Sequence, residues 1–191
     1  MGLRIKKISY GYKERRESER QAYLEQLTTL DPKALIFMDE SGIDDNETYP
    51  YAWGAHGQRV YGIKKANRAK RLSIISALNE NHLQAPFVFE GYCNRDVIHL
   101  YIEQVLVPTL KPGQIVIMDN ASFHKSKRIK EAIEKAQCQL LYLPDLPAYS
   151  PDLNPIEHFW AAIKNSIRKA LTRTDADLYE AAQFAFQNVS I

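Results

Sequence analysis

The sequence predicts an α/β fold in which a mixed β-sheet carries helices on both faces. Two short apolar runs, residues 34–38 and 115–118, have the composition of buried strands. From residue 93 onward, segments with helical spacing of apolar residues alternate with further apolar runs. Strands that come first and then alternate with helices favour such a sheet. At 191 residues, 45% of them hydrophobic and 25% charged, the chain is long enough for one domain with a sizeable core.

The first third of the chain supplies an arm, a strand and an insertion. Residues 1–33 are rich in charge, and a helix from about Lys13 to Leu30 would have a thin apolar face, so we expect a linker or arm. The domain itself is expected over 34–191. Its first strand, "ALIFMDES", carries Asp39 at its carboxyl end. Residues 42–70 form an expected insertion, with a hairpin around "YAWGAHGQRVY".

The remaining elements are predicted from segments with the apolar pattern of strands, which alternate with segments that have the apolar spacing of helices. "RLSIISAL" and "APFVFEGY" are typical of two strands joined by the turn "NENHLQ". "CNRDVIHLYIEQVLVPTL" has helical spacing with Asn94 as its N-cap, and "QIVIMDN" is a second buried strand that ends in Asp119. The order is completed by a helix over 127–136, the strand "QLLYLP", a proline-rich loop over 144–155, a long helix and a last helix over 175–188.

The stretch "SPDLNPIEHFW" predicts how the long helix begins. Asn154 is a favoured N-cap and Pro155 suits the first helical position. Glu157 follows the cap by three residues, which predicts a capping box. At 100° per residue Glu157 lies beside an apolar stripe, so capping explains it and a second role stays open. The stripe consists of Ile156, Phe159, Trp160, Ile163, Ile167 and Leu171.

Three acids, Asp39, Asp119 and Glu157, stand at positions that can converge. Two of them end apolar strands and the third opens a helix, and open α/β sheets place their ligands at the carboxyl ends of strands. Three carboxylates with open sides suit Mg²⁺, and two such ions about 3.5–4 Å apart can bracket a phosphodiester. A strand-end aspartate taken alone is more often a turn residue or a cap, so spacing leaves that interpretation open.

Basic residues are clustered although the net charge is only +2. No acid interrupts residues 54–78, and five acids lie just before this stretch, within 39–47. A single charged run is usually a solvated face, but several basic clusters beside an acidic one favour a site that holds metal ions against a polyanion. The candidate DNA-binding residues are Lys64, Lys65, Arg68, Lys70, Arg71, Lys125, Lys127, Lys164 and Arg168.

The blocks "FMDESG", "IVIMDNASFHKS" and "LPAYSPDLNPIEHFWAAIK" resemble the three catalytic blocks of DDE transposases of the mariner-like lineage, specifically the related bacterial insertion-sequence group. The resemblance covers residues 34 to about 171, and its third block is the most specific. The last two acids are separated by residues 120–156, a spacing typical of the family. The resemblance implies a ribonuclease-H-like fold, with three antiparallel strands followed by alternating helices and strands.

By this resemblance Asp39, Asp119 and Glu157 match the metal-binding catalytic acids of the family. The implied cofactor is a pair of Mg²⁺ ions, for which Mn²⁺ would substitute. The implied reaction is hydrolysis of a phosphodiester at the end of a transposable element, followed by attack of the freed 3′-hydroxyl on target DNA. Glu157 would then be the third catalytic acid, with capping as its second role.

Neighbouring residues are assigned more narrowly. Asn120 and His124 match family positions for which we expect a role behind the metal ligands or in contact with phosphate, although His124 is equally explained as a helix cap. Glu40 follows Asp39 on the opposite face of the strand, so we exclude it from the site. His158 is 100° around the helix from Glu157 and is excluded as well. Trp160 belongs to the apolar stripe and is expected in the core.

The expected partners are double-stranded DNA, at element ends and target, and a second copy of the chain when assembled on DNA. The insertion over 42–70 lies where relatives carry a loop that helps to pair subunits. Relatives also carry a longer N-terminal helix-turn-helix region than residues 1–33 allow. We therefore expect Met1 to begin the second frame of a split gene, with a helix-turn-helix polypeptide from an upstream frame as partner, or else a truncated element.

The expected location is the bacterial cytoplasm, at the nucleoid, because the longest apolar runs are too short to span a membrane. Two alternatives to a transposase stay open. One is a domesticated or truncated domain that binds DNA or other subunits without cutting. The other is a different two-metal nuclease on the ribonuclease-H-like fold.

Overall fold

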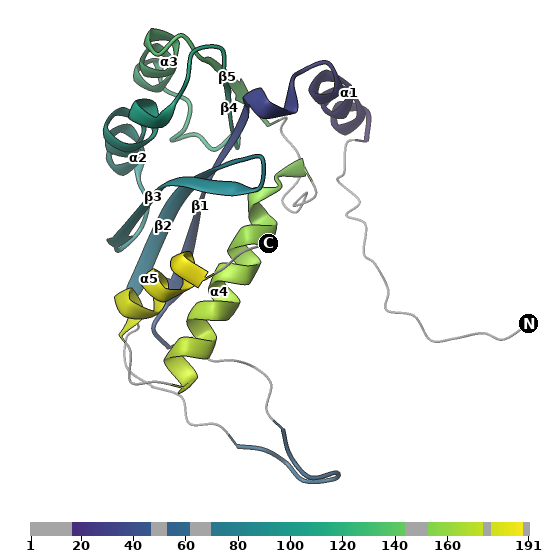
Figure 1. Ribbon diagram of the computed structural model, residues 1–191, viewed down its shortest axis with the longest axis vertical. Coiled ribbons are helices and arrows are strands. Elements are labelled where there is room, and N and C mark those ends of the chain that lie inside the picture. Colours follow the sequence, from purple (N-terminus) through teal and green to yellow (C-terminus); the bar gives the residue numbers. More distant parts are fainter. Residues whose placement is uncertain (1–16, 47–52, 62–69, 144–152, 174–176, 189–191) are drawn as a thin grey trace, which may run out of the picture.

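The computed structural model describes residues 17–46, 53–61, 70–143, 153–173 and 177–188. They form one five-stranded sheet in the order β3-β2-β1-β4-β5 (Figure 1). β1, β2 and β3 are antiparallel neighbours, and β4 and β5 extend the sheet in parallel with β1. The predicted mixed sheet is therefore confirmed. Its strands are β1 (Leu35–Asp44), β2 (Arg71–Asn79), β3 (His82–Glu90), β4 (Ile115–Met118) and β5 (Gln139–Tyr142).

The central strand β1 is longer than the sequence predicts. The sequence predicts a strand over "ALIFMDES", with Asp39 near its end, and an insertion from residue 42. The strand instead continues to Asp44, so residues 42–44 belong to it, because β2 pairs with it from Phe37 opposite Leu78 to Asp44 opposite Arg71. On its other side β1 pairs with β4 only over residues 35–37. Asp39 thus lies within a strand, but just beyond the point where one of the two neighbouring strands has ended.

The connection between β2 and β3 is a tight hairpin. Glu80 and Asn81 both have positive φ, 44° and 69°, as a two-residue turn between antiparallel strands requires. The next residue, His82, already pairs with Asn79. The expected turn over 79–84 is therefore too long, and β3 begins three residues earlier than predicted.

One face of the sheet is covered by α2 (Arg95–Tyr101) and α3 (Lys127–Lys135). Asn94 caps α2 as predicted, with its side chain accepting a hydrogen bond of 3.1 Å from the N–H of Val97. The expected helix does not stay regular. It changes to a π-helical turn over Ile102–Leu106 and a 3-10 turn over Val107–Thr109, where Pro108 has no N–H for an α-helical bond.

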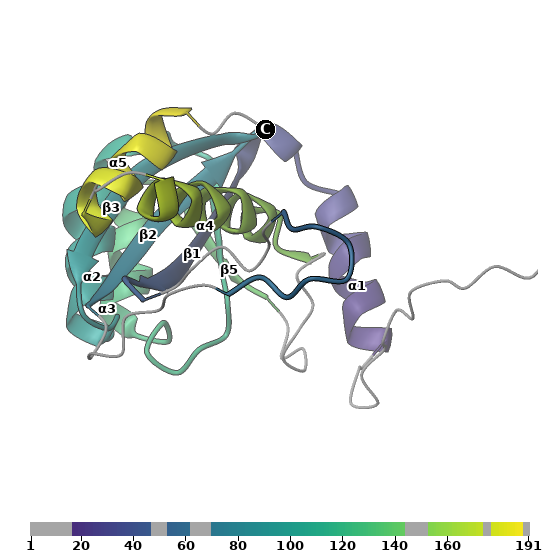
Figure 2. The same ribbon diagram turned by 90° about the horizontal axis from the view of Figure 1, so that it is seen from below.

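The other face is covered by α4 (Ile156–Arg173) and α5 (Leu178–Asn188), so the sheet lies between two helical layers (Figure 2). The apolar stripe of α4 is buried against β1 and β2, as the sequence predicts. A reciprocal capping box opens α5. The N–H of Glu180 donates to Asp177 Oδ1 at 2.9 Å, and the N–H of Asp177 donates to Glu180 Oε2 at 3.1 Å.

The helix α1 (Glu17–Thr28) precedes the sheet and ends two residues before the predicted Leu30, while residues 13–16 of the predicted helix lie outside the described part. Leu27 and Leu30 pack against the small apolar cluster formed by Leu35, Ile115 and Ile117. The end of the predicted arm is thus attached to the start of β1 and β4. No helix in the described part of the chain is long and apolar enough to cross a membrane.

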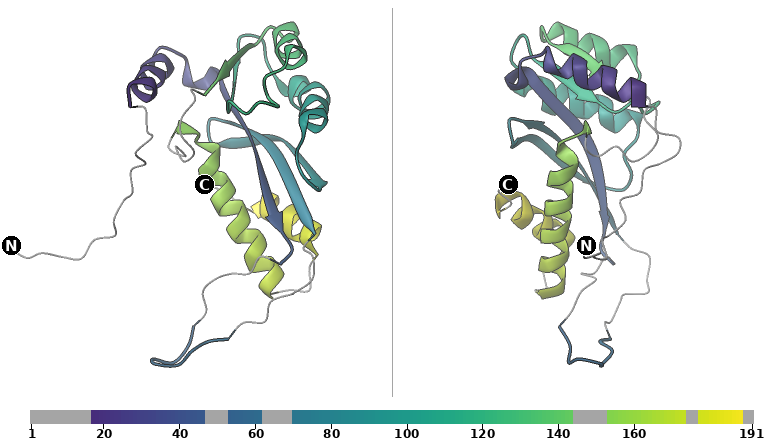
Figure 3. Two further views of the ribbon diagram at one scale, coloured as in Figure 1. Left: turned by 180° about the vertical axis from the view of Figure 1, so that it is seen from behind. Right: turned by 90° about the vertical axis from the view of Figure 1, so that its right-hand side faces the viewer.

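Residues 53–61 are the described part of the insertion between β1 and β2. They contain a turn closed by a hydrogen bond of 3.1 Å from Gln58 N–H to Ala55 O, and they form no strand, so the expected hairpin is wrong within this range. The Trp53 side chain is fully exposed. Figure 3 shows α4 running lengthwise along β1, with residues 53–61 extending past the far end of that helix.

Candidate active site

The register of the two central parallel strands places the first two acids at the same level. Phe37 of β1 pairs with Ile117 of β4, so two residues further along Asp39 stands level with Asp119. β4 ends at Met118, and the chain leaves the sheet at Asp119. The predicted strand-end position is therefore confirmed for Asp119. Asp39 does not end its own strand, but it lies just past the end of the neighbouring strand β4.

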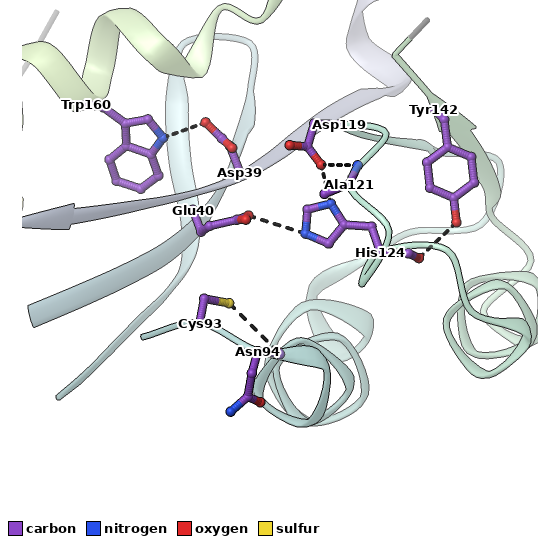
Figure 4. Close-up of polar contacts among 9 residues, drawn as sticks. All are labelled: Asp39, Glu40, Cys93, Asn94, Asp119, Ala121, His124, Tyr142 and Trp160. Atoms are coloured by element: carbon purple, nitrogen blue, oxygen red, sulfur yellow. Dashed lines mark hydrogen bonds and ion pairs between the residues drawn. The ribbon is translucent and has the colours of Figure 1, made fainter. Parts of the chain in front are cut away.

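Asp39 is nearly enclosed, with 8% of its surface exposed. The indole N–H of Trp160, on α4, donates a hydrogen bond of 3.0 Å to Asp39 Oδ2 (Figure 4). Burial, and then the charges of Glu40 and Glu157, raise the pKa of Asp39 to about 8, because together they outweigh the hydrogen bonds from the Glu40 backbone and Trp160, which lower it. Glu157 lies three residues before Trp160 on the same helix, so α4 brings this acid to the neighbourhood of Asp39. Sequence reasoning placed Trp160 correctly in the core but did not predict its hydrogen bond.

Asp119 is anchored by the loop that follows it. Its Oδ1 accepts a short hydrogen bond from His124 Nδ1 and a bond of 3.0 Å from the N–H of Ala121. Partial burial acts to raise the pKa of Asp119, but these two hydrogen bonds and the charge of His124 outweigh it and lower the pKa. The Asp119 side chain keeps 45% of its surface exposed, so the carboxylate remains accessible.

His124 is completely buried between two acids. Its Nδ1 faces Asp119, and its Nε2 lies 3.4 Å from Glu40 Oε2. Burial acts to lower the pKa of His124, but the contacts with Asp119 and Glu40 outweigh it and raise the pKa to about 10. His124 does not cap a helix. Ser126 is the N-cap of α3, accepting a bond of 3.2 Å from the N–H of Ile129.

Glu40 was excluded from the site because strand alternation turns it away from Asp39. The alternation holds, since Asp39 points toward α4 and Glu40 points toward His124 (Figure 4). Glu40 nevertheless belongs to the site region, because the loop after β4 places His124 on the same face of the sheet as Glu40. In the sequence, the adjacency of Asp39 and Glu40 is the signal for this role, because no local pattern indicates that the loop after β4 brings His124 to Glu40.

Glu157 lies in the first turn of α4 and is exposed. The helix begins with backbone hydrogen bonds, from Glu157 N–H to Asn154 O at 3.1 Å and from His158 N–H to Pro155 O at 3.3 Å. Within the described residues the Asn154 side chain does not bond to the N–H of Glu157, so the capping box predicted here is wrong. The Glu157 carboxylate has no hydrogen-bond or ion-pair partner among the described residues, which leaves it available for a ligand. His158 is also exposed.

A family described as "DDE superfamily endonuclease" matches residues 34–179, which include all of the sheet and the start of α5. The chain belongs to the DDE superfamily endonucleases.

Individual relatives of this DDE endonuclease chain are more distant. Over 74 residues it is 38% identical to the Transposable element Tcb2 transposase of Caenorhabditis briggsae, a match that covers 35% of this chain and 26% of that protein. Its fold is similar to that in the Mos1 Strand Transfer Complex, with a TM-score of 0.68 and 19% identity over 96% of this chain and 57% of that chain.

A second Mos1 structure, the mariner Mos1 paired end complex with Mg, has a TM-score of 0.67 and 20% identity over 98% of this chain and 59% of that chain. The catalytic domain of Mos1 mariner transposase has a TM-score of 0.58 and 18% identity over 91% of this chain and 78% of that chain. These likenesses confirm the ribonuclease-H-like fold. The DDE endonuclease chain spans about a quarter of the Tcb2 protein and under two thirds of the Mos1 chain in both complexes.

The three acids fit a hard divalent cation by ligand type, since Mg²⁺ prefers carboxylate oxygens. The raised pKa of Asp39 reflects burial and two neighbouring carboxylates, a cost that a cation would relieve. Nevertheless, no three His, Cys, Asp or Glu side chains in the described part of the chain lie close enough together to hold a metal ion. Asp39 is turned to Trp160 and Asp119 to His124, so the triad is present but not gathered around one point. Asn120, beside Asp119, is half-buried.

The candidate DNA-binding residues that the structure describes lie at three separate places. Lys70 and Arg71 begin β2, where Lys70 is exposed but Arg71 is bound to Asp44 at 3.3 Å and lies 4.8 Å from the centre of the Tyr92 ring. Lys64, Lys65 and Arg68 lie outside the described residues.

The other two groups lie on opposite faces of the sheet. Lys125 and Lys127 are exposed near the start of α3, and Lys127 is paired with Glu131 at 3.4 Å. Lys164 and Arg168 are half-buried on α4. The described bases therefore do not form one continuous surface around Asp39.

Proposed function

We propose that this chain is the catalytic domain of a DNA transposase of the mariner/Tc1 type, with Asp39, Asp119 and Glu157 as its catalytic acids. The observation that carries the proposal is their placement. Asp39 and Asp119 stand level on neighbouring parallel strands, and α4, whose Trp160 is hydrogen-bonded to Asp39, carries Glu157 three residues before that tryptophan. Membership of the DDE superfamily endonucleases and the Mos1-like fold support the same assignment.

The acids would hold two Mg²⁺ ions, with Mn²⁺ as a substitute, and structures of Mos1 complexes with Mg and with Mn are among the fold's relatives. Such ions activate the attacking oxygen and stabilise the leaving oxygen of a phosphodiester. The protein's own residues orient the ligands. Trp160 holds one oxygen of Asp39, whereas His124 and Ala121 hold Oδ1 of Asp119. Asn120 would act behind these ligands or on phosphate.

The proposed substrate is double-stranded DNA, first at the element ends and then at the target. The Mos1 relatives are described as a strand transfer complex and as paired end complexes, which supports DNA binding and a second copy of the chain as partner. We further propose that the chain belongs to a bacterial insertion-sequence element and acts at the nucleoid, together with a helix-turn-helix region encoded in an upstream frame. The sequence blocks in residues 34–171 support this finer assignment.

The test is cleavage of supercoiled plasmid by the purified chain with Mg²⁺, with Mn²⁺ and with chelator. Nicking that requires the metal and disappears in Asp119→Asn, while the circular dichroism spectrum is unchanged, is the expected result. Asparagine keeps the shape of aspartate but removes the charge that a divalent ion needs. Equal nicking by wild type and Asp119→Asn would overturn the catalytic assignment. Faster cleavage of an RNA–DNA hybrid than of duplex DNA would instead favour a different two-metal nuclease.

A further inference from the structure

Glu40 is an acid inside the site region that the proposed mechanism does not use. It follows Asp39 on β1 but points to the opposite face of the sheet, and 19% of its side chain is exposed. The cationic group that faces it is His124, which is completely buried. Glu40 Oε2 and His124 Nε2 are 3.4 Å apart (Figure 4).

These two atoms have no alternative partner in the described part of the chain. Glu40 Oε2 and His124 Nε2 are both buried, and neither makes a hydrogen bond of good geometry to any described group. A buried polar atom without a partner costs about 1–3 kcal/mol, and more if it is charged. Because the two atoms lie 3.4 Å apart and are opposite in character, the contact between them offsets a cost that both would otherwise carry.

The other end of the same ring holds Asp119. His124 Nδ1 donates to Asp119 Oδ1, which also receives the N–H of Ala121 at 3.0 Å. The backbone of His124 is fixed as well, since its carbonyl accepts a hydrogen bond of 3.0 Å from the hydroxyl of Tyr142. The ring is therefore held at both nitrogens and at its backbone. Asp119 Oδ2 accepts none of the hydrogen bonds formed among the described residues.

We propose that Glu40 is a positioning residue: by holding the far side of the His124 ring, it keeps His124 on Asp119 Oδ1 and leaves Asp119 Oδ2 available for a divalent ion. This inference rests on the proposed function, because it assumes that Asp119 is a metal ligand. Residues that hydrogen-bond to metal ligands commonly change metal affinity about 10–100-fold when they are replaced. Glu40 would act one step further back, through the histidine.

Two substitutions separate this role from others. Glu40→Gln removes the charge but keeps a group that can hydrogen-bond to His124 Nε2, so we expect it to retain Mn²⁺ affinity within a few-fold. Glu40→Met has similar length and no hydrogen-bonding group, so affinity should fall about 10–100-fold. If Glu40 were itself a metal ligand, Gln and Met would both lose binding. Glu103→Met is the matched control, because it breaks another glutamate ion pair, that with Arg128, on α3.

The experiment measures two properties of each folded variant. Binding of Mn²⁺ is followed by electron paramagnetic resonance, with Asp119→Asn as the variant that should not bind. In the metal-free chain, proton NMR follows the strongly deshielded N–H of His124 Nδ1, identified by its absence in His124→Gln. We expect this signal in wild type, Glu40→Gln and Glu103→Met, and its loss or a large upfield shift in Glu40→Met.

The two readouts fail independently. An unchanged His124 signal in Glu40→Met, or full Mn²⁺ affinity in that variant, would overturn the positioning role even if the metal site is real. Equal loss of Mn²⁺ binding in Glu40→Gln and Glu40→Met would overturn it in favour of direct ligation. If the His124 signal responds as expected but the wild-type chain binds no Mn²⁺, the effect of Glu40 on His124 is supported and the proposed function fails.

Discussion

Trp160 on α4 donates its indole N–H to Oδ2 of Asp39 on β1, joining residues 121 positions apart at 3.0 Å. The same helix carries Glu157 three residues before this tryptophan. This one contact therefore fixes the orientation of Asp39 and the position of α4, and with it of Glu157, along β1. Because both partners are buried, solvent does not compete for the bond.

Trp160→Phe tests this relationship. Phenylalanine keeps an aromatic ring in the core but removes the donor, so the free energy of unfolding should fall by at least roughly 0.5–1.5 kcal/mol. Loss of orientation at Asp39 should lower Mn²⁺ affinity and DNA nicking about 10–100-fold. Trp53→Phe, at a fully exposed tryptophan, is the control and should change neither. Wild-type nicking by Trp160→Phe would show that the bond serves stability alone.

The stability of the metal-free chain should depend on Asp39 as pH changes. Its pKa is about 8 in the folded chain against an ordinary value of 3.8, so between these values the folded state holds more protons than the unfolded state. The free energy of unfolding therefore falls as pH rises through this window. His124 adds to the fall at higher pH, since its stabilising contribution is complete below 6.5 and is lost as pH rises through about 10.

Urea unfolding in the presence of chelator, at about pH 5 and about pH 9, measures this dependence. Asp39→Asn keeps an acceptor for Trp160 but does not titrate, so its stability should fall less between the two pH values than that of wild type. The lowered pKa of Asp119 acts in the opposite direction, but only at pH values below its ordinary range, outside this window. Parallel pH profiles for wild type and Asp39→Asn would refute the assignment of the fall to Asp39.

Glu157 should be needed for cleavage and not for stability. The sequence predicted that it closes a capping box, in which case Glu157→Ala would cost about 0.5–2 kcal/mol. In the structure its carboxylate is exposed and takes no part in capping within the described residues, so both Glu157→Ala and Glu157→Gln should lie within about 0.5 kcal/mol of wild type. Both should lose metal-dependent nicking.

The matched control for this pair is Glu180→Ala, which removes the capping box that the structure does contain, at α5. It should lower the free energy of unfolding by about 0.5–2 kcal/mol and leave nicking per folded molecule unchanged. If Glu157→Ala destabilises as much as Glu180→Ala, the capping role predicted from the sequence would be restored.

The sequence predicted those features that depend on local periodicity. The apolar runs of β1 and β4, the stripe on α4 and the cap at Asn94 are all where the spacing indicates. The prediction was wrong where the structure depends on pairing between segments that are distant in the sequence. β1 extends past Asp39 because β2 pairs with it, and Glu40 joins the site region because the loop after β4 carries His124 across the sheet. Both depend on contacts that no window of sequence contains.

The same limit explains the two capping boxes. "NPIE" and "DLYE" offer equivalent cap residues, and only the second forms the reciprocal bonds. Asn154 is buried, with 7% of its surface exposed, beside the apolar stripe of α4. Local preference therefore placed the start of α4 within a residue, whereas the predicted start of the last helix at residue 175 is too early, since α5 begins at Leu178 after its cap Asp177. Tertiary packing decided which side chains complete each cap.

Binding of DNA by basic residues that precede β2 in the sequence is the last prediction. Lys64, Lys65 and Lys70 are proposed to contact phosphates, and each contact contributes about −0.9 to the slope of log affinity against log salt concentration. Arg71 is left out because Asp44 and Tyr92 already engage it. Changing these three lysines to glutamine should flatten the slope by up to about 2.7 units without altering sequence preference. Fluorescence anisotropy with a labelled duplex over a salt series gives the slope.

The control carries the same charge change elsewhere. Lys111, Lys130 and Lys135 are exposed, the last two on α3, and none of them is among the predicted DNA-binding residues. Changing them to glutamine should shift the net charge equally but leave the slope close to that of wild type, because counterions are released only where phosphates are contacted. Equal flattening in both triple variants would mean that net charge alone attracts the DNA. An unchanged slope in the first would mean that these lysines are a solvated face.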